Sequence, residues 1–192
     1  MPLDLLIVFG SVRRDRRGIG LARFLAAAAR GRGHAATLVD PMETPLPMLD
    51  RMYKEYPPGE APEILETLAG QIRRADAIVV VSAEYNHSIP PALSNLLDHF
   101  LEEFFWRPSA IACYSAGGFG GVRAAMQLRA MLAELGMPSI PSLFPVPKVQ
   151  DAFDLDGTIK DGAYSKRADR FLGELEWYAG ALKAARAAGV PY

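Results

Sequence analysis

Residues 77–91 read AIVVVSAEYNHSIPP, an apolar run that passes directly into polar and aromatic residues and ends in two prolines. Ala77 to Ser82 is rich in β-branched residues without polar alternation, as expected of a strand buried on both faces. Pro90 and Pro91 suit the first turn of a helix. The stretch therefore predicts a buried strand, a polar loop and a helix, the unit from which parallel α/β sheets are built.

The same alternation of strand and helix continues on both sides of this stretch. Short apolar runs predict four further strands, at residues 3–9, 35–39, 110–114 and about 139–143. Apolar residues at helical spacing predict helices at residues 19–30, 63–74, 93–104, 121–135 and around 171–182. Residues 41–62 hold six prolines and are expected to form a long ordered loop. Five such strands predict one parallel sheet with helices on both faces, which binds ligands at the carboxyl ends of its strands.

Length and composition suit one globular domain spanning residues 1–192. The chain has 21 basic and 22 acidic residues and a net charge of −1. This near-neutral balance gives no overall attraction to nucleic acid or to an anionic membrane. Cys113 is the single cysteine and the three histidines are scattered, so we expect no disulfide and no metal site. The start lacks a basic secretory region and a membrane-spanning run, so a cytoplasmic protein is expected.

The loop after the first strand, residues 10–20, reads GSVRRDRRGIG. Glycines allow a tight turn with accessible amides, Ser11 adds a hydroxyl, the arginines add forked donors, and the following helix points its positive end into the loop. This combination predicts a site for a phosphate dianion. The alternative is a solvated basic turn, but the position between a buried strand and a helix favours binding.

The loop after the third strand holds Glu84, Tyr85, Asn86 and His87. A planar ligand with mixed polar edges, such as a flavin ring, needs a wall of amides and aromatic surface of this kind. The alternative is that these residues only cap the next helix. For His87 alone we favour a position on the rim, because nothing in the sequence pairs with it as a nucleophile or a metal ligand.

The loop after the fourth strand, residues 114–123, reads YSAGGFGGVR. Its glycines allow close approach of the backbone to a ligand, and Ser115 with the amides near Gly117 and Gly118 would face the same pocket. Donors and a positive helix end at this place would stabilise the negative charge of a reduced flavin. A flexible hinge is the alternative. Cys113 is expected to be a buried strand residue and not a nucleophile.

Together the three loops resemble those of the NADPH-dependent FMN reductase family, which includes quinone and azo-dye reductases. The most specific likeness is residues 84–90, EYNHSIP, followed by a helix with the family pattern Leu-x-Asn-x-x-Asp, here residues 93–98. The resemblance implies a flavodoxin-like three-layer α/β sandwich with strand order 2-1-3-4-5. It also implies bound FMN and the use of NADPH or NADH as a substrate.

Carried over to this chain, the resemblance assigns three groups of cofactor-binding residues. The FMN phosphate is assigned to Ser11, Arg13, Arg16 and Gly18, and the neighbouring Ile19 is counted among the cofactor-binding residues. The isoalloxazine and ribityl chain are assigned to Glu84, Tyr85, Asn86 and His87, and the pyrimidine edge to Ser115, Gly117 and Gly118. Two departures are Ala83, where the family usually has proline, and Arg107, where it usually has lysine; we expect Ala83 to loosen its loop.

The implied activity is an NAD(P)H oxidoreductase that reduces small acceptors such as quinones, azo compounds, flavins or oxidised metals in two half-reactions. No catalytic side chain is expected, because the flavin supplies the chemistry. We expect Arg14 or Arg17 to favour NADPH through its 2′-phosphate. A flavodoxin-type electron carrier is the main alternative, disfavoured by the near-neutral charge and the arginine-rich loop; a protein with a decayed flavin site is another.

Self-association is also expected. The predicted helix at residues 93–104 is apolar on more than one face, and residues 104–106 extend that surface. Part of this surface could equally belong to the core. The family resemblance implies homodimers or homotetramers formed through this region, with residues 41–62 bordering the site of a neighbouring copy.

Overall fold

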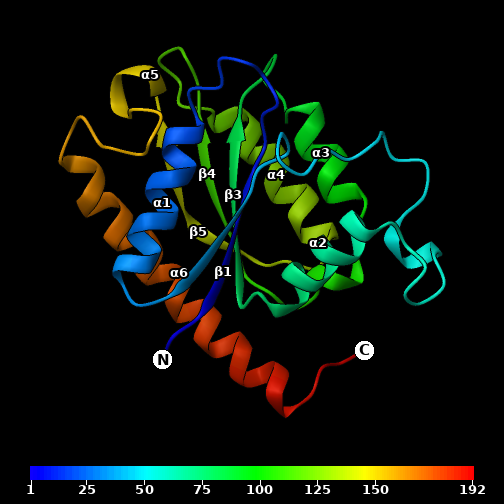
Figure 1. The fold of residues 1–192 in the computed structure, drawn as a ribbon. Helices are drawn as coiled ribbons and strands as arrows, with labels where there is room; N and C mark the ends of the chain where they lie inside the picture. Colours follow the sequence, from blue (N-terminus) through cyan, green and yellow to red (C-terminus); the bar gives the residue numbers. More distant parts are fainter.

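The computed structural model describes residues 1–192 and contains one five-stranded parallel sheet with the order β2-β1-β3-β4-β5 (Figure 1). The strands are β1 (Asp4–Phe9), β2 (Ala35–Val39), β3 (Ala77–Ala83), β4 (Ser109–Tyr114) and β5 (Ser139–Val146). The predicted strand order is therefore confirmed, and each strand lies where the apolar pattern placed it. Only β5 is clearly longer than expected.

Helices cover both faces of the sheet. They are α1 (Ile19–Gly31), α2 (Glu63–Arg74), α3 (Pro91–Asp98), α4 (Val122–Glu134), α5 (Val149–Ala152) and α6 (Ala163–Ala188), with short 3-10 turns at Tyr53–Glu55 and Glu102–Phe104. Helices α1 and α6 pack on one face, and α2, α3 and α4 pack on the other. None of them is both long and apolar enough to cross a membrane.

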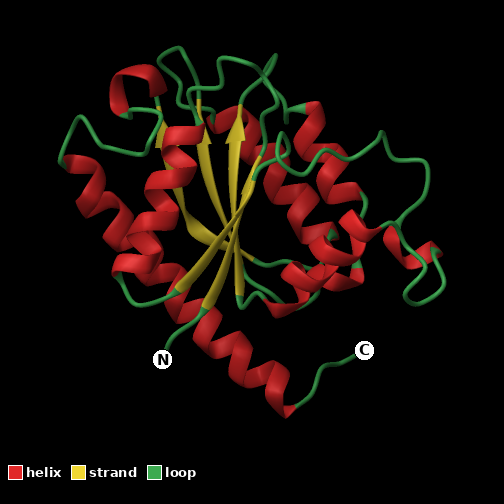
Figure 2. Ribbon diagram, in the orientation of Figure 1, coloured by secondary structure: helices red, strands yellow, loops and turns green.

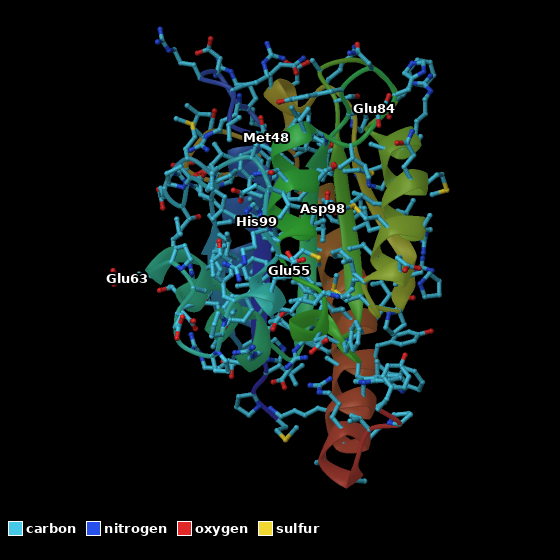
Figure 3. The ribbon with its side chains drawn as sticks, turned by 90° about the vertical axis from the view of Figure 1, so that its right-hand side faces the viewer. Met48, Glu55, Glu63, Glu84, Asp98 and His99 are labelled. Carbon is cyan, nitrogen blue, oxygen red and sulfur yellow. The ribbon has the colours of Figure 1, made fainter.

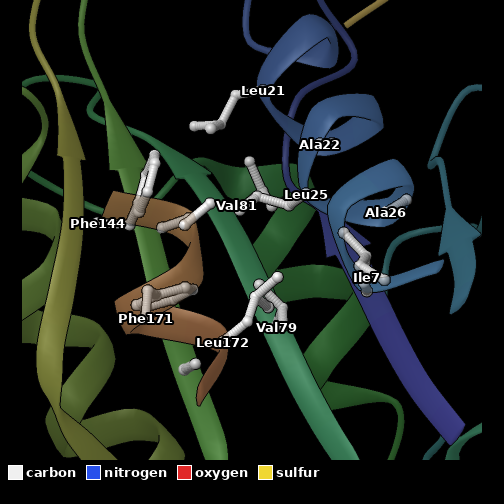
Figure 4. Packing of buried hydrophobic residues seen from close by; sticks show 14 of the residues in the cluster. Ile7, Leu21, Ala22, Leu25, Ala26, Val79, Val81, Phe144, Phe171 and Leu172 are labelled. Carbon is white, nitrogen blue, oxygen red and sulfur yellow. The ribbon is translucent and has the colours of Figure 1, made fainter. Parts of the chain in front are cut away.

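β3 is buried along its whole length because a helical layer covers each of its faces. Val79 and Val81 point into the layer formed with α1 and α6, while Ile78 and Val80 point into the opposite layer. Figure 4 shows the first of these layers, in which the strand residues meet side chains of α1 and α6. This double burial explains why the strand has no polar alternation.

The helix predicted over residues 93–104 is shorter than expected. It ends at Asp98, and the chain continues through a turn into a separate 3-10 turn. The apolar residues of the pattern are nevertheless all in the core of this chain, apart from the half-buried Leu101: Leu93, Leu96, Leu97, Phe100 and Phe104. The pattern therefore reflects burial within one chain, and these side chains offer no surface to a second copy.

The proline-rich segment after β2 is fixed to the body of the protein by α3. The side chain of Asn95 accepts a hydrogen bond from the amide of Leu49 (2.8 Å) and donates one to the carbonyl of Pro47 (2.8 Å). The amide of Tyr53 donates to the carbonyl of His99 (2.8 Å). The expectation of a long ordered loop is thus confirmed, and Asn95 of the Leu-x-Asn-x-x-Asp pattern has a structural role here.

Candidate functional site

All five strands end on the same side of the molecule, so the loops after β1, β3 and β4 gather there (Figure 2). We call residues 10–18 the first loop, residues 84–90 the third loop and residues 115–121 the fourth loop. The Ser11 hydroxyl lies 2.7 Å from the hydroxyl of Tyr85, which joins the first loop to the third. The ring of Tyr114 lies directly against Gly18, where an added Cβ would come within 2.0 Å of it. The three loops therefore form one continuous surface.

The first loop has the properties of an anion-binding turn. The amides of Val12 and of residues 14–18 donate no hydrogen bond to another backbone group. Helix α1, which follows, has no side-chain cap and no acidic residue in its first turn. Arg13, Arg14 and Arg17 are exposed and their side chains form no ion pair. Free amides, a helix N-terminus and unpaired guanidinium groups together favour a phosphate.

Arg16 differs from the other arginines of the first loop because its guanidinium group is already paired. It forms a bidentate ion pair with Asp40, a buried residue directly after β2. The distance between Nη2 of Arg16 and Oδ2 of Asp40 is 2.6 Å. It also donates to the carbonyl of Ser11 (3.3 Å). Asp40 accepts a further bond from the amide of Met42 (3.0 Å). Arg16 thus ties the first loop to the end of β2, a role that the sequence did not reveal.

The third loop is a tight hairpin. Tyr85 and Ser88 exchange two backbone hydrogen bonds (3.0 and 2.9 Å), and Asn86 and His87 between them have φ angles of 51° and 63°. Two successive positive φ angles define a type I′ turn, which asparagine tolerates better than most residues. The side chains of Asn86 and His87 are exposed, as expected of a rim position for His87.

Ala83 does not loosen the third loop. It is the last residue of β3, where it is paired with Tyr114 of β4 and is buried. The expectation drawn from the missing proline is therefore wrong, because the sheet itself holds the start of this loop.

Glu84 caps helix α4. Its carboxylate accepts hydrogen bonds from the Arg123 side chain (2.9 Å) and from the amides of Arg123 (3.0 Å) and Ala124 (3.4 Å). Burial alone would raise the pKa of Glu84, but these donors outweigh it and the pKa lies below its usual value. Figure 3 shows Glu84 near the loop end of the molecule, with Asp98 and His99 farther along. The carboxylate thus joins the third loop to α4.

We expect Glu84→Gln to lower the free energy of unfolding by about 1–3 kcal/mol at pH 7, because charge-assisted bonds at the N-terminus of α4 are weakened. The pKa of Glu84 in the folded protein lies below that in the unfolded chain, which is about 4.3. The stabilisation is therefore complete above the unfolded pKa and is lost as the pH falls through the folded pKa. Urea unfolding of both proteins at several pH values measures this difference. Glu60→Gln, at an exposed loop position, is the control; an equal effect of both substitutions would contradict the capping role.

The fourth loop is braced rather than free to act as a hinge. The Ser115 hydroxyl donates to the carbonyl of Gly117 (2.9 Å) and accepts from the amide of Gly120 (2.9 Å). Gly121 has φ +80° and lies so close to Tyr114 that an added Cβ would be 2.6 Å from its amide nitrogen. At Gly117 and Gly118 an added Cβ would meet nothing within 4 Å. The loop is therefore fixed at its base and open along its upper edge.

Several residues of this end of the molecule were missed by the sequence analysis: Asp40, Tyr114, Arg123 and Gln127. Gln127 of α4 donates to the carbonyl of His87 (2.9 Å) and accepts from the Ser88 hydroxyl (2.7 Å), which fixes the third loop from a second side. Asp40 could have been noticed as a carboxylate directly after a strand. Nothing in the sequence marks Gln127. Cys113 is buried, which raises its pKa to about 12, so it is no nucleophile, as expected.

The three loops fit a phosphorylated flavin. Besides the free amides of the first loop, residues 116–119 and Asn86 and His87 have amides without a backbone acceptor. These donors lie on the loops around one surface, which extends from the unpaired arginines of the first loop to Gly117 and Gly118 of the fourth loop. The fold thus defines a flavodoxin-like protein, and its loops form a candidate site for a phosphate-bearing planar ligand at the carboxyl end of the sheet.

Comparison with known proteins gives the family. The model of the NADPH-dependent FMN reductase family matches residues 3–151, and the chain belongs to this family. A quinone reductase from Pseudomonas putida is 32% identical over 141 residues, which are 70% of this chain and 72% of the relative. A 2-hydroxy-1,4-benzoquinone reductase from Burkholderia is 33% identical over 140 residues, 70% of this chain and 73% of the relative. Membership of this family confirms the sequence-based prediction of an FMN-dependent NAD(P)H oxidoreductase.

The fold is shared with a solved flavoenzyme, FerB from Paracoccus denitrificans, described as an NAD(P)H:(acceptor) oxidoreductase. The two structures agree with a TM-score of 0.72 at 22% sequence identity, over 95% of this chain and 98% of the other. At this identity the agreement concerns the fold, and it confirms the flavodoxin-like architecture predicted from the sequence.

Proposed function

We propose that this protein holds FMN across the first, third and fourth loops and uses NAD(P)H to reduce quinones and azo compounds. The acceptor class is supported by the names of the relatives, two quinone reductases and an NADPH azoreductase from Bacillus that is 28% identical over 140 residues. The observation that carries the placement of FMN is the set of free amides and unpaired arginines at one end of the sheet. Held by these loops, FMN would supply the hydride-transfer chemistry that links NAD(P)H oxidation to reduction of the acceptor.

In this proposal each loop has a separate task. Arg13, the hydroxyl of Ser11 and the free amides up to Gly18 hold the phosphate. The amide of Ile19 already donates to the carbonyl of Arg16 (3.2 Å), so Ile19 only borders this site. Arg16 supports the loop from behind through Asp40. The residues 84–87 line the ring and the ribityl chain, mainly through Tyr85 and backbone groups, because the Glu84 carboxylate is already engaged by α4.

The fourth loop has an electrostatic task. Residues 115–118 lie at the pyrimidine edge, where the free amides of residues 116–118 stabilise negative charge. Glu84 already compensates the positive end of α4, so the loop amides rather than the helix supply this stabilisation. No side chain has to act as a general base.

We expect replacement of both Arg14 and Arg17 by alanine to lower kcat/KM for NADPH about tenfold while leaving that for NADH within about twofold. A charge-assisted contact with the 2′-phosphate, which NADH lacks, accounts for an effect of this size. Steady-state kinetics with both nucleotides measure it, and Arg170→Ala, at an exposed position of α6, is the control. An unchanged ratio of the kcat/KM values for NADPH and NADH would contradict this role of Arg14 and Arg17.

Within this proposal the protein is a cytoplasmic homo-oligomer. Burial of most apolar side chains of residues 93–104 gives little support to self-association through that region. The start of the long loop offers exposed apolar side chains instead, Met42, Met48 and Leu49. Met48 lines a cavity together with Val12 of the first loop. This cavity of about 320 Å³ lies between the start of the long loop and α3. Light scattering on the wild type and on Met48→Lys tests whether this surface joins two copies; an oligomer unaffected by the lysine would exclude it.

The proposed function is tested by NAD(P)H oxidation with the FMN-loaded protein across a panel of acceptors. We expect turnover with quinones and azo compounds, and no turnover without added or bound FMN. A protein that binds FMN but turns over with none of these acceptors would contradict the proposed acceptor class. A protein that does not bind FMN would contradict the proposed site.

A further inference from the structure

Phe119 is the single phenylalanine of this chain with an exposed side chain. Its relative exposure is 65%, whereas the other eight phenylalanines are buried or half-buried. It lies at the tip of the fourth loop, between the open Gly118 and the positive-φ Gly120. An exposed aromatic ring at the mouth of a cofactor site is a common feature of ligand recognition.

The ring of Phe119 is supported from one side only. The Arg123 guanidinium carbon lies 4.1 Å from the centroid of the ring. Arg123 is itself held by the carboxylate of Glu84 (2.9 Å), and Glu84 is fixed by two amides of α4. One face of the ring therefore rests on a fixed charged group, and the high exposure leaves the other face free.

The loop that carries Phe119 is held in place at its base. The Ser115 hydroxyl bridges Gly117 and Gly120, and the carbonyl of Gly117 accepts a bond from the amide of Lys148 (2.9 Å). A ring whose position is fixed in advance loses little conformational entropy when a second ring stacks on it. This arrangement suits stacking with a planar ligand better than a freely moving side chain would.

We propose that Phe119 is a specificity-determining residue that stacks on the second ring of extended aromatic acceptors, such as naphthoquinones and two-ring azo compounds. The inference rests on the proposed function, which places the flavin against residues 115–118. An acceptor with one small ring is confined to the flavin itself. An acceptor with a second ring extends beyond the flavin edge and reaches Phe119 at the tip of the adjoining loop.

The test compares Phe119→Ala and Phe119→Tyr in the FMN-loaded protein. We expect the alanine variant to lose about tenfold in kcat/KM for a two-ring azo compound and a naphthoquinone, mainly through KM, which is the size of one lost aromatic pair. The values for benzoquinone and for ferricyanide, which has no ring to stack, are expected to stay within about twofold, and tyrosine is expected to restore the two-ring acceptors. Trp177→Ala, a 70% exposed aromatic on α6, is the matched control.

Three results would overturn the inference. Equal losses for all acceptors would indicate damage to the fourth loop, and no loss for two-ring acceptors would show that they do not reach Phe119. A change of oligomeric state in light scattering of the alanine variant would assign the ring to a contact between copies. A wild type that reduces none of these acceptors would instead contradict the proposed function, so the two failures are distinguishable.

Discussion

Replacing Asp40 with alanine is expected to lower the free energy of unfolding by about 3–5 kcal/mol, because Arg16 is then left without its partner inside the protein. Asp40 is 2% exposed and the Arg16 side chain 13%, so water cannot take over the lost bonds. Urea unfolding of the FMN-free protein measures the change. FMN affinity should fall as well, since the first loop loses its attachment to the end of β2.

Asp169→Ala is the matched control for this prediction. Asp169 also pairs with an arginine, Arg32, at 3.3 Å, but it is 69% exposed. An exposed pair of this kind contributes about 0–1 kcal/mol, so the control should be close to the wild type. If Asp40→Ala and Asp169→Ala have equally small effects, Arg16 is not the support of the first loop that we infer.

Replacing Gly121 with alanine is expected to reduce FMN affinity at least about tenfold while the fold is retained. An alanine Cβ would lie 2.6 Å from the amide nitrogen and 2.8 Å from the carbonyl oxygen of Tyr114, and φ +80° is itself unfavourable for alanine. Because backbone atoms cannot move aside as a flexible side chain does, the fourth loop must shift away from β4. Fluorescence titration of the FMN-free variant with FMN measures the affinity.

Gly180→Ala is the control for the glycine prediction. Gly180 lies inside α6, its φ is not positive, and an added Cβ would meet nothing within 4 Å. Alanine should there be neutral or slightly stabilising, by up to about 1 kcal/mol. Normal FMN binding by Gly121→Ala would show that the close contact with Tyr114 is not needed to hold the loop.

The fold could be predicted from the sequence because the decisive signals are local. The buried run at residues 77–82 has no polar alternation, and the segment 63–74 has a helical pattern that matches α2 residue for residue. The short helix α5 was missed because it spans only four residues. The early start of α6 at Ala163 was missed because the buried residues of its first turns, Tyr164 and Ala168, stand among charged and polar residues. The break after Asp98 was missed because Phe100 and Phe104 keep helical spacing although a turn separates them from α3.

The site could be predicted only in part, because its loops are local features while their supports are not. The glycines and arginines of the first loop are visible in the sequence. The partner of Arg16 is 24 residues away and is brought close only by the pairing of β1 with β2. In the same way Glu84 meets Arg123 only after β3 and β4 have paired. Sequence patterns indicate which groups can bind an anion, but not which of them the fold uses internally.

The most direct test of the account is anaerobic mixing of the FMN-loaded protein with NADPH alone, followed by mixing with a quinone. We predict that the flavin absorbance is bleached rapidly by NADPH without any partner protein, and that the quinone restores it. A flavin that stays oxidised with NADPH and NADH, yet accepts electrons from a separate reductase protein, would show an electron carrier and contradict the assignment as an NAD(P)H:acceptor oxidoreductase.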